Sequence, residues 1–147
     1  MRQRKAKVSS LHKQKIFWPR ILQQRRHRHR APGTRNWRIN NGARERITLI
    51  QRPLIPGAGL DDVAGTLDAQ IKSRPAGTVG DLHRNTVFGG RSGLAYDEFP
   101  ADGTTVRWQV LVDSGLQVSV GCQYVSGNWQ PIAGVCEGFV HDLRINP

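Results

Sequence analysis

The sequence predicts an α+β fold: a mostly antiparallel sheet covered by two helices, preceded by a disordered basic arm. Three observations lead to this class. Two segments near the C-terminal end alternate apolar and polar residues around a short turn, which is typical of an antiparallel hairpin. Two other segments carry apolar residues at helical spacing. The order strand, helix, several strands, helix favours helices packed on an antiparallel sheet.

The first strand and helix are predicted just after position 45. Residues 47–51 form a β-branched, partly alternating run, which predicts a strand that stops at Pro53. After a glycine-containing turn, the apolar residues share one stripe of an amphipathic helix that ends before Pro75: Leu60, Val63, Ala64, Leu67 and Ile71.

The middle of the chain predicts strands. A short strand is expected at 86–88 and another at 94–99, with turns between them. The clearest element is the hairpin of residues 105–112 and 116–124. Its apolar residues alternate with polar ones in both strands: Val106, Trp108, Val110 and Val112, then Leu116, Val118, Val120, Cys122 and Tyr124. We expect one buried and one solvated face, with the helices covering the buried side.

The final segment predicts a second helix. Its apolar stripe consists of Ile132, Val135, Cys136, Phe139, Val140 and Leu143. Pro131 suits the first turn of such a helix. Gly134 and Gly138 lie inside it, and each costs about 0.8–1 kcal/mol relative to Ala. This helix is therefore expected to depend on tertiary packing.

Charge divides the chain into a disordered arm, residues 1–45, and a folded domain, residues 46–147. Residues 1–46 hold 15 Lys and Arg and one acid, whereas residues 47–147 hold seven Lys and Arg and ten acids. High charge with few aliphatic residues gives too little apolar burial to offset the entropy of ordering the arm. The chain as written also contains no run of 18 apolar residues and no secretory signal.

The two cysteines are the most informative pair of residues. Cys122 lies on the apolar face of its strand, and Cys136 lies on the apolar stripe of the last helix. If that helix covers that face, the sulfurs approach each other, and a bridge would stabilise the domain by roughly 3 kcal/mol. The alternative is two buried free thiols that pack as small hydrophobes. The pattern favours the disulfide.

Several glycine and acidic motifs imitate active sites without completing them. Gly57 and Gly59 imitate a dinucleotide-binding loop, but Asp62 stands where the third glycine belongs. The run Gly90-Arg91-Ser92-Gly93 misses the nucleophile elbow by one residue and predicts a turn. Asp97 and Glu98 are neighbours on a strand, so their carboxylates are expected on opposite faces.

The histidines do not form a catalytic or metal-binding group either. His83 and His141 are isolated, and His141 is expected to be exposed. His27 and His29 are surrounded by arginines that repel cations. We therefore predict no catalytic residue, no metal site and no cofactor.

The region from about Arg46 to Ile145 resembles the C-terminal domain of actinobacterial type VII secretion-associated proteins. The resemblance is carried by the runs ITLIQRPL (47–54), LDDVAGTL (60–67), WQVLV (108–112) and QVSVGCQ (117–123), with Cys136-Glu137 downstream. The stretch from Val110 to Gln123 is the most specific part. The element order is also similar to that of the PsbP/Mog1-like fold, a curved antiparallel sheet between helices.

This resemblance implies a non-enzymatic structural or interaction domain of a type VII (ESX) secretion system. It implies an extracytoplasmic location at the cell envelope, partners among the proteins of the secretion apparatus, and a bridge between Cys122 and Cys136. Family members usually carry a longer N-terminal region with a membrane-spanning helix. Here an Arg-rich arm stands in its place, so we also formulate the hypothesis that residues 1–45 are not native coding sequence and that the chain is truncated.

Two other functions stay open at this point. The arm can bind nucleic acid or ribosomes through Arg25, Arg26, Arg28 and Arg30, with Phe17, Trp18 and Trp37 available for stacking on bases. In that case the protein is expected in the cytoplasm. The concave face of the sheet can also hold a small molecule.

Overall fold

The computed structural model describes residues 33–38 and 44–145 of the 147-residue chain. Within them, six strands form one antiparallel sheet with the order β1-β2-β6-β5-β4-β3. The strands are β1 (Gly33–Arg38), β2 (Arg46–Pro53), β3 (His83–Phe88), β4 (Arg91–Glu98), β5 (Thr104–Asp113) and β6 (Leu116–Val125). The helices are α3 (Leu60–Lys72) and α4 (Gln130–Asp142). The predicted α+β class is confirmed.

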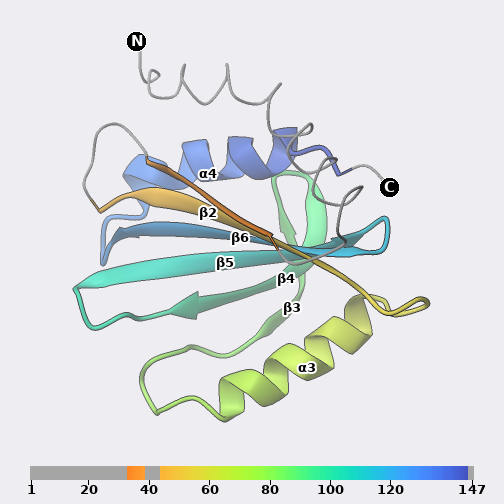
Figure 1. The fold of residues 1–147 in the computed structure, drawn as a ribbon. Helices are drawn as coiled ribbons and strands as arrows, with labels where there is room; N and C mark the ends of the chain where they lie inside the picture. Colours follow the sequence, from red (N-terminus) through yellow and green to blue (C-terminus); the bar gives the residue numbers. More distant parts are fainter. Residues whose placement is uncertain (1–32, 39–43, 146–147) are drawn as a thin grey trace.

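The two helices lie on opposite faces of the sheet (Figure 1). The expectation that both cover one apolar face is wrong, and the turn between β5 and β6 explains why. Ser114 and Gly115 both have positive φ, 54° and 74°, as in the primed turns that join hairpin strands through two residues. Asp113 therefore pairs with Leu116, and every even position of β5 lies opposite an odd position of β6.

This register places the apolar stripes of β5 and β6 on different faces. Val110 lies opposite Ser119, whereas Leu111 lies opposite Val118. Residues paired across strands share a face of the sheet. The predicted solvated face of the hairpin is thus also wrong, because Gln109 is buried on the side that carries α4. Each face of the sheet has its own apolar cluster.

The larger cluster lies between α4 and the sheet, and the smaller one lies beneath α3. The larger contains Ile47, Leu49, Leu111, Leu116, Val118, Val120, Cys122, Tyr124, Ile132, Cys136, Phe139, Val140 and Leu143. The smaller contains Val63, Ala64, Leu67, Leu94 and Val110. The helical stripes predicted from the sequence are the buried faces of the two helices.

The N-terminal boundary of the domain lies earlier than predicted. β1 was expected to belong to the unfolded arm, yet it pairs with β2 through six residues, from Gly33 opposite Gln51 to Arg38 opposite Arg46. The ring of Trp37 packs on Phe139 of α4, with centroids 5.3 Å apart. A short strand at the edge of an existing sheet needs little apolar residue content of its own, which is why composition missed it. The other residues of the predicted arm, 1–32 and 39–43, lie outside the described residues.

The turn predicted at residues 90–93 is shorter than expected. The turn contains Gly89 and Gly90, and β4 begins at Arg91. Gly89 has a φ of +58°, and a Cβ on it would lie 2.8 Å from the carbonyl oxygen of Glu137. This glycine lets the β3–β4 turn approach the backbone of α4 closely.

Candidate interaction surface

A buried disulfide attaches α4 to the sheet. Cys122 of β6 and Cys136 of α4 are both fully buried and are bonded to each other, with their Cα atoms 6.2 Å apart. The bond closes a loop over a sequence separation of 14 residues. It fastens the helix whose two internal glycines make it weak in isolation.

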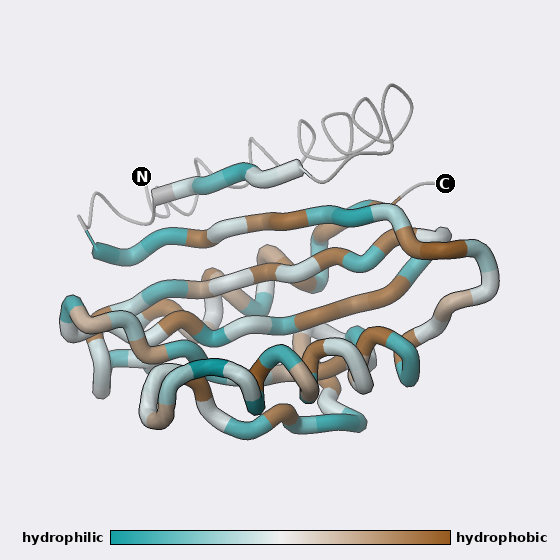
Figure 2. Tube along the Cα trace, turned by 60° about the horizontal axis from the view of Figure 1, so that its bottom comes forward, coloured by the Kyte–Doolittle hydropathy of each residue, from teal (hydrophilic) through white to brown (hydrophobic). Residues whose placement is uncertain are grey.

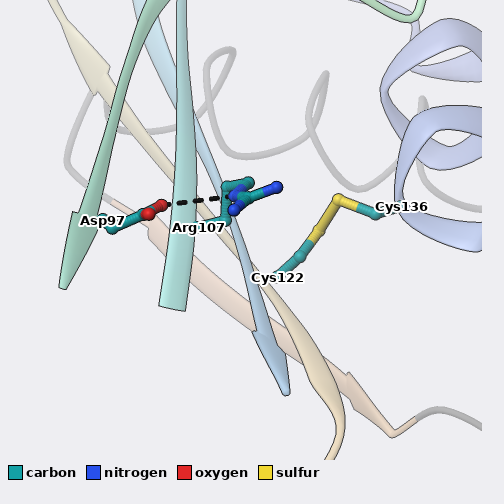
Figure 3. The surroundings of a disulfide bond; sticks show 4 residues. All are labelled: Asp97, Arg107, Cys122 and Cys136. Carbon is teal, nitrogen blue, oxygen red and sulfur yellow. Dashed lines mark hydrogen bonds and ion pairs between the residues drawn. A yellow bond between two sulfur atoms is a disulfide. The ribbon is translucent and has the colours of Figure 1, made fainter. Parts of the chain in front are cut away.

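A cation–π cluster surrounds the N-terminal end of α4. Arg107 of β5 lies opposite Cys122 in the strand register, and its guanidinium carbon is 4.2 Å from the ring centroid of Trp129, the N-cap residue of α4. The same group is 5.8 Å from the ring centroid of Tyr124. Its Nε donates to Oδ1 of Asp97 at 3.3 Å (Figure 3). The guanidinium of Arg107 thus links the Asp97 carboxylate of the sheet to the Trp129 ring at the start of α4, which stabilises the helix–sheet contact.

The neighbouring carboxylate, Glu98, serves the opposite face, as predicted from strand alternation. It accepts a hydrogen bond from Nε1 of Trp108 at 2.9 Å and forms an ion pair with Arg74 at 3.4 Å. Trp108 in turn stacks on Tyr96, with ring centroids 6.3 Å apart. Burial, with a smaller contribution from the negative charge of Glu98, raises the pKa of Tyr96 to about 12. Tyr96 is therefore a neutral packing residue at physiological pH.

Within the described residues, α3 covers only part of the width of its side of the sheet. The apolar cluster beneath α3 takes its sheet residues from β4 and β5 and extends to Val112 and Leu82. The same side of β1, β2 and β6 has no residue in that cluster. Figure 2 shows α3 in front of the lower strands, and no other described helix lies on this side of the strands towards β1.

We call this uncovered region the open face. It consists of residues that the strand register places on the α3 side and none of which is buried: Thr34, Asn36, Arg46, Thr48, Ile50, Arg52, Gln117, Ser119 and Gln123. Most of them carry hydroxyl, amide or guanidinium groups. This composition differs sharply from that of the opposite side of the same strands, where Ile47, Leu49, Val118 and Val120 are buried.

The open face has an internal hydrogen-bond network and an aromatic border. The hydroxyl of Thr48 donates to Oδ1 of Asn36 at 2.6 Å, and Nε2 of Gln123 donates to the hydroxyl of Thr104 at 2.9 Å. The ring of Trp108 lies over Gly121, where a Cβ would come within 2.7 Å of its Cζ3 atom. Trp108 thus separates the open face from the apolar half beneath α3.

Arg46 contributes an unsatisfied donor to the open face. Its Nε atom is buried and has no hydrogen-bond partner among the described residues. A buried donor without a partner costs about 1–3 kcal/mol.

The remaining sequence-predicted residues are placed as follows. His83 and His141 are both exposed and lie on β3 and α4, respectively, and His141 is 3.2 Å from Asp142. Gly59 precedes α3 in an ordinary turn, and its N–H donates to Oδ2 of Asp62 at 2.9 Å. Ser92 is an exposed residue of β4. Within the described ranges, no group of three His, Cys, Asp or Glu side chains is placed to hold a metal ion.

The alternative nucleic-acid interface was predicted in the basic arm. Arg25, Arg26, Arg28 and Arg30, as well as His27, His29, Phe17 and Trp18, lie outside the described residues. Trp37, which was available for stacking on bases under this alternative, packs against Phe139 at the edge of the larger apolar cluster. This contact weakens the case for base stacking by the arm.

The open face was not predicted from the sequence, because the two apolar stripes of the hairpin were expected on one side of the sheet. The signal was present in the turn, since a two-residue loop at Ser114 and Gly115 fixes which positions pair. That register places Gln117, Ser119 and Gln123 of β6 on the same side of the sheet as Val110 and Trp108 of β5. On this side β6 is therefore polar, whereas its neighbour β5 is apolar.

Comparisons of the sequence with protein-family models and with curated proteins found no match. Neither helix in the described part of the chain has the length and apolar character needed to cross a membrane. The site must therefore be interpreted from its own geometry.

Proposed function

We propose that this chain is a non-enzymatic, extracytoplasmic interaction domain associated with a type VII (ESX) secretion system. The observation that carries the location is the Cys122–Cys136 disulfide. Disulfides persist in oxidising compartments and are rare in the cytosol. The residue runs that resemble the type VII secretion-associated family, including both cysteines, supply the link to secretion.

The arrangement of polar groups supports an interaction role rather than catalysis. Asp97 and Glu98, the adjacent carboxylates, are engaged by Arg107 on one face and by Trp108 and Arg74 on the other. The open face offers a hydrogen-bonding surface that is bordered by Trp108 and contains Arg46 and Arg52. Tryptophan and arginine are enriched among the residues that dominate protein–protein interfaces.

The location is tested by peptide mass mapping of the endogenous protein from separated envelope and cytosol fractions, without reduction and with free thiols alkylated before lysis. Chymotrypsin is the suitable protease, because no Lys or Arg lies between Trp108 and Leu143 and trypsin leaves both cysteines on one peptide. Cleavage after Tyr124 and Trp129 separates them. We expect linked Cys122 and Cys136 peptides in the envelope fraction. Alkylated cysteines in the cytosol would contradict the proposal.

The link to secretion needs a separate test. Deleting the gene in its native host should change the set of proteins exported by the type VII system, and the full-length gene should restore it. A Cys122→Ser/Cys136→Ser double variant provides the control for the disulfide and should restore export poorly. An unchanged secretome after deletion would contradict the association with secretion while leaving the location untouched.

Nucleic-acid binding through the arm is the second candidate, and the charge of residues 1–32, with eleven Lys and Arg and no acid, favours it. Such binding weakens steeply with salt because condensed counterions are released. Replacing Arg25, Arg26, Arg28 and Arg30 with Gln should then abolish binding to an RNA oligonucleotide and flatten the salt dependence. Unchanged binding in this variant would exclude the arm as the interface.

A further inference from the structure

We propose that the open face binds an acidic segment of a protein partner. The inference rests on the proposed role as an interaction domain and adds the chemistry of the partner. It is independent of the location and of the secretion system, so its test uses purified protein.

Beside α3, no described helix covers β1, β2 and β6 on this side of the sheet. Strands lie about 4.8 Å apart, so β1, β2 and β6 together present a strip roughly 10–14 Å wide. A single helix or extended segment with its side chains is about 10–12 Å across. The strip therefore matches one polypeptide segment lying alongside α3, not a whole domain.

The charges on the open face favour an acidic partner. Arg46 and Arg52 lie in rows at the two ends of the open face, and the set of residues that forms it contains no acid. Arg52 acts electrostatically on Tyr96, as does Arg74 near the end of α3, which agrees with the orientation of Arg52 towards this side of the sheet. A carboxylate supplies the opposite charge and can accept charge-assisted hydrogen bonds from guanidinium groups such as those of Arg46 and Arg52.

Charge also opposes two other occupants of the open face, the basic arm of the chain and a second copy of it. Residues 1–32 carry eleven basic side chains and no acid, so their charge repels them from a face with two arginines. A second copy of the chain has a net charge of +11, which opposes self-association. An acidic segment from another protein is attracted by both the open face and the whole chain.

The small number of cationic groups on the open face favours carboxylates over a nucleic-acid backbone as its ligands. Phosphate-tracking surfaces use many cationic contacts, about 6–10 in a typical duplex complex. Among the described side chains, the open face has two arginines, and its other polar groups are hydroxyls and amides, which suit a few carboxylates and main-chain groups. One face of the Trp108 ring is already covered by Gly121, and the ring stacks on Tyr96, so it serves as a wall.

The area of the open face sets the expected affinity for the acidic segment. Four rows of residues along three strands present an area on the order of 300 Å². Interfaces this small belong to weak and transient complexes. We therefore expect dissociation constants in the high micromolar range.

The test is an NMR titration of the ¹⁵N-labelled full chain with a short poly-L-glutamate peptide. Per-residue amide shifts separate binding at the open face from non-specific binding to the basic arm. We expect saturable shifts at Thr48, Ser119 and Gln123. Arg52→Gln should weaken this binding about threefold, the scale of one exposed charge contact. Arg52 is exposed, so the substitution preserves the fold.

Arg84→Gln is the matched control, because Arg84 is also an exposed strand arginine but lies on β3 at the far edge of the sheet. It should leave the titration unchanged. Shifts confined to residues 1–32, or equal weakening by both substitutions, would overturn the proposal. So would tighter binding of a single-stranded oligonucleotide at the same amides, or the same shifts on raising protein concentration alone, which would indicate nucleic acid or a second copy as the occupant.

Discussion

At the scale of single residues, Gly121 and Trp108 define the border between the two halves of the α3 side. They face each other in the register of β5 and β6, and the indole ring covers the glycine where a side chain would otherwise stand. The ring is held from its other sides by the hydrogen bond to Glu98 and by the stack on Tyr96. Its position is therefore fixed by three separate contacts.

Gly121→Ala should destabilise the protein. The new Cβ would lie within 3 Å of three carbons of the Trp108 ring, which would have to move away from its hydrogen bond with Glu98. Overpacking of this kind costs typically about 1–3 kcal/mol. Urea unfolding followed by tryptophan fluorescence measures the loss. A variant as stable as the wild type would show that the ring is free to shift.

Tyr96 should make the protein sensitive to alkali. Its pKa is about 12 in the folded protein and 10.0 in the absence of burial. The unfolded chain therefore loses this proton first, and the stability that it contributes is complete below pH 10 and is lost as the pH rises through 12. Between pH 10 and 12 the unfolding free energy of Tyr96→Phe should therefore fall less than that of the wild type, when each is measured relative to its own value at pH 7. Parallel curves for the two proteins would contradict this assignment.

At the scale of elements, α4 combines weak intrinsic helicity with strong anchoring. Gly134 and Gly138 are exposed within it, and no atom would meet a Cβ at either position within 4 Å. The helix is held by its apolar stripe, by the disulfide and by the packing of Arg107 on Trp129. Tertiary contacts thus offset what the sequence of the helix lacks.

Gly134→Ala and Gly138→Ala should each stabilise the protein. Alanine removes the backbone entropy cost of glycine in a helix, worth about 0.8–1 kcal/mol per site, and neither methyl group meets a neighbour. Thermal unfolding of the single and double variants measures the gain. Gly89→Ala is the control and should lower the stability instead, because its Cβ would collide with the backbone of α4 at Glu137 and His141. A loss of stability in both helix variants would show that these positions pack against something.

At the scale of the whole molecule, the domain is a sheet with an unequal cover on its two sides. α4 and the larger apolar cluster cover one side, while α3 covers β4 and β5 on the other. Strand β1 completes the sheet at the uncovered edge and brings Trp37 to α4. The domain therefore includes residues that composition alone assigns to the basic arm.

Truncation should locate the true boundary of the domain. Removing residues 1–32 should change the unfolding free energy by less than about 0.5 kcal/mol, because the sequence predicts no packed structure there. Removing residues 1–45 also deletes β1 and Trp37 and should cost roughly 3 kcal/mol, the scale for losing a large aromatic residue from a packed site. Trp37→Ala in the full chain measures how much of this loss of unfolding free energy comes from the Trp37 side chain. Equal stability of both truncations would restore the boundary at residue 46.

The sequence by itself determined the class of the fold, the two helical stripes and the opposed orientation of Asp97 and Glu98. These are local properties, because helical and strand periodicity depend on residues only a few positions apart. The tertiary structure alone decided which helical stripe packs on which side of the sheet. Strand pairing has a period of two, so the register set by Ser114 and Gly115 moves every side chain of β6 to one face or the other. The same pairing recruited β1 and left the open face uncovered, and neither follows from the periodicity of a single segment.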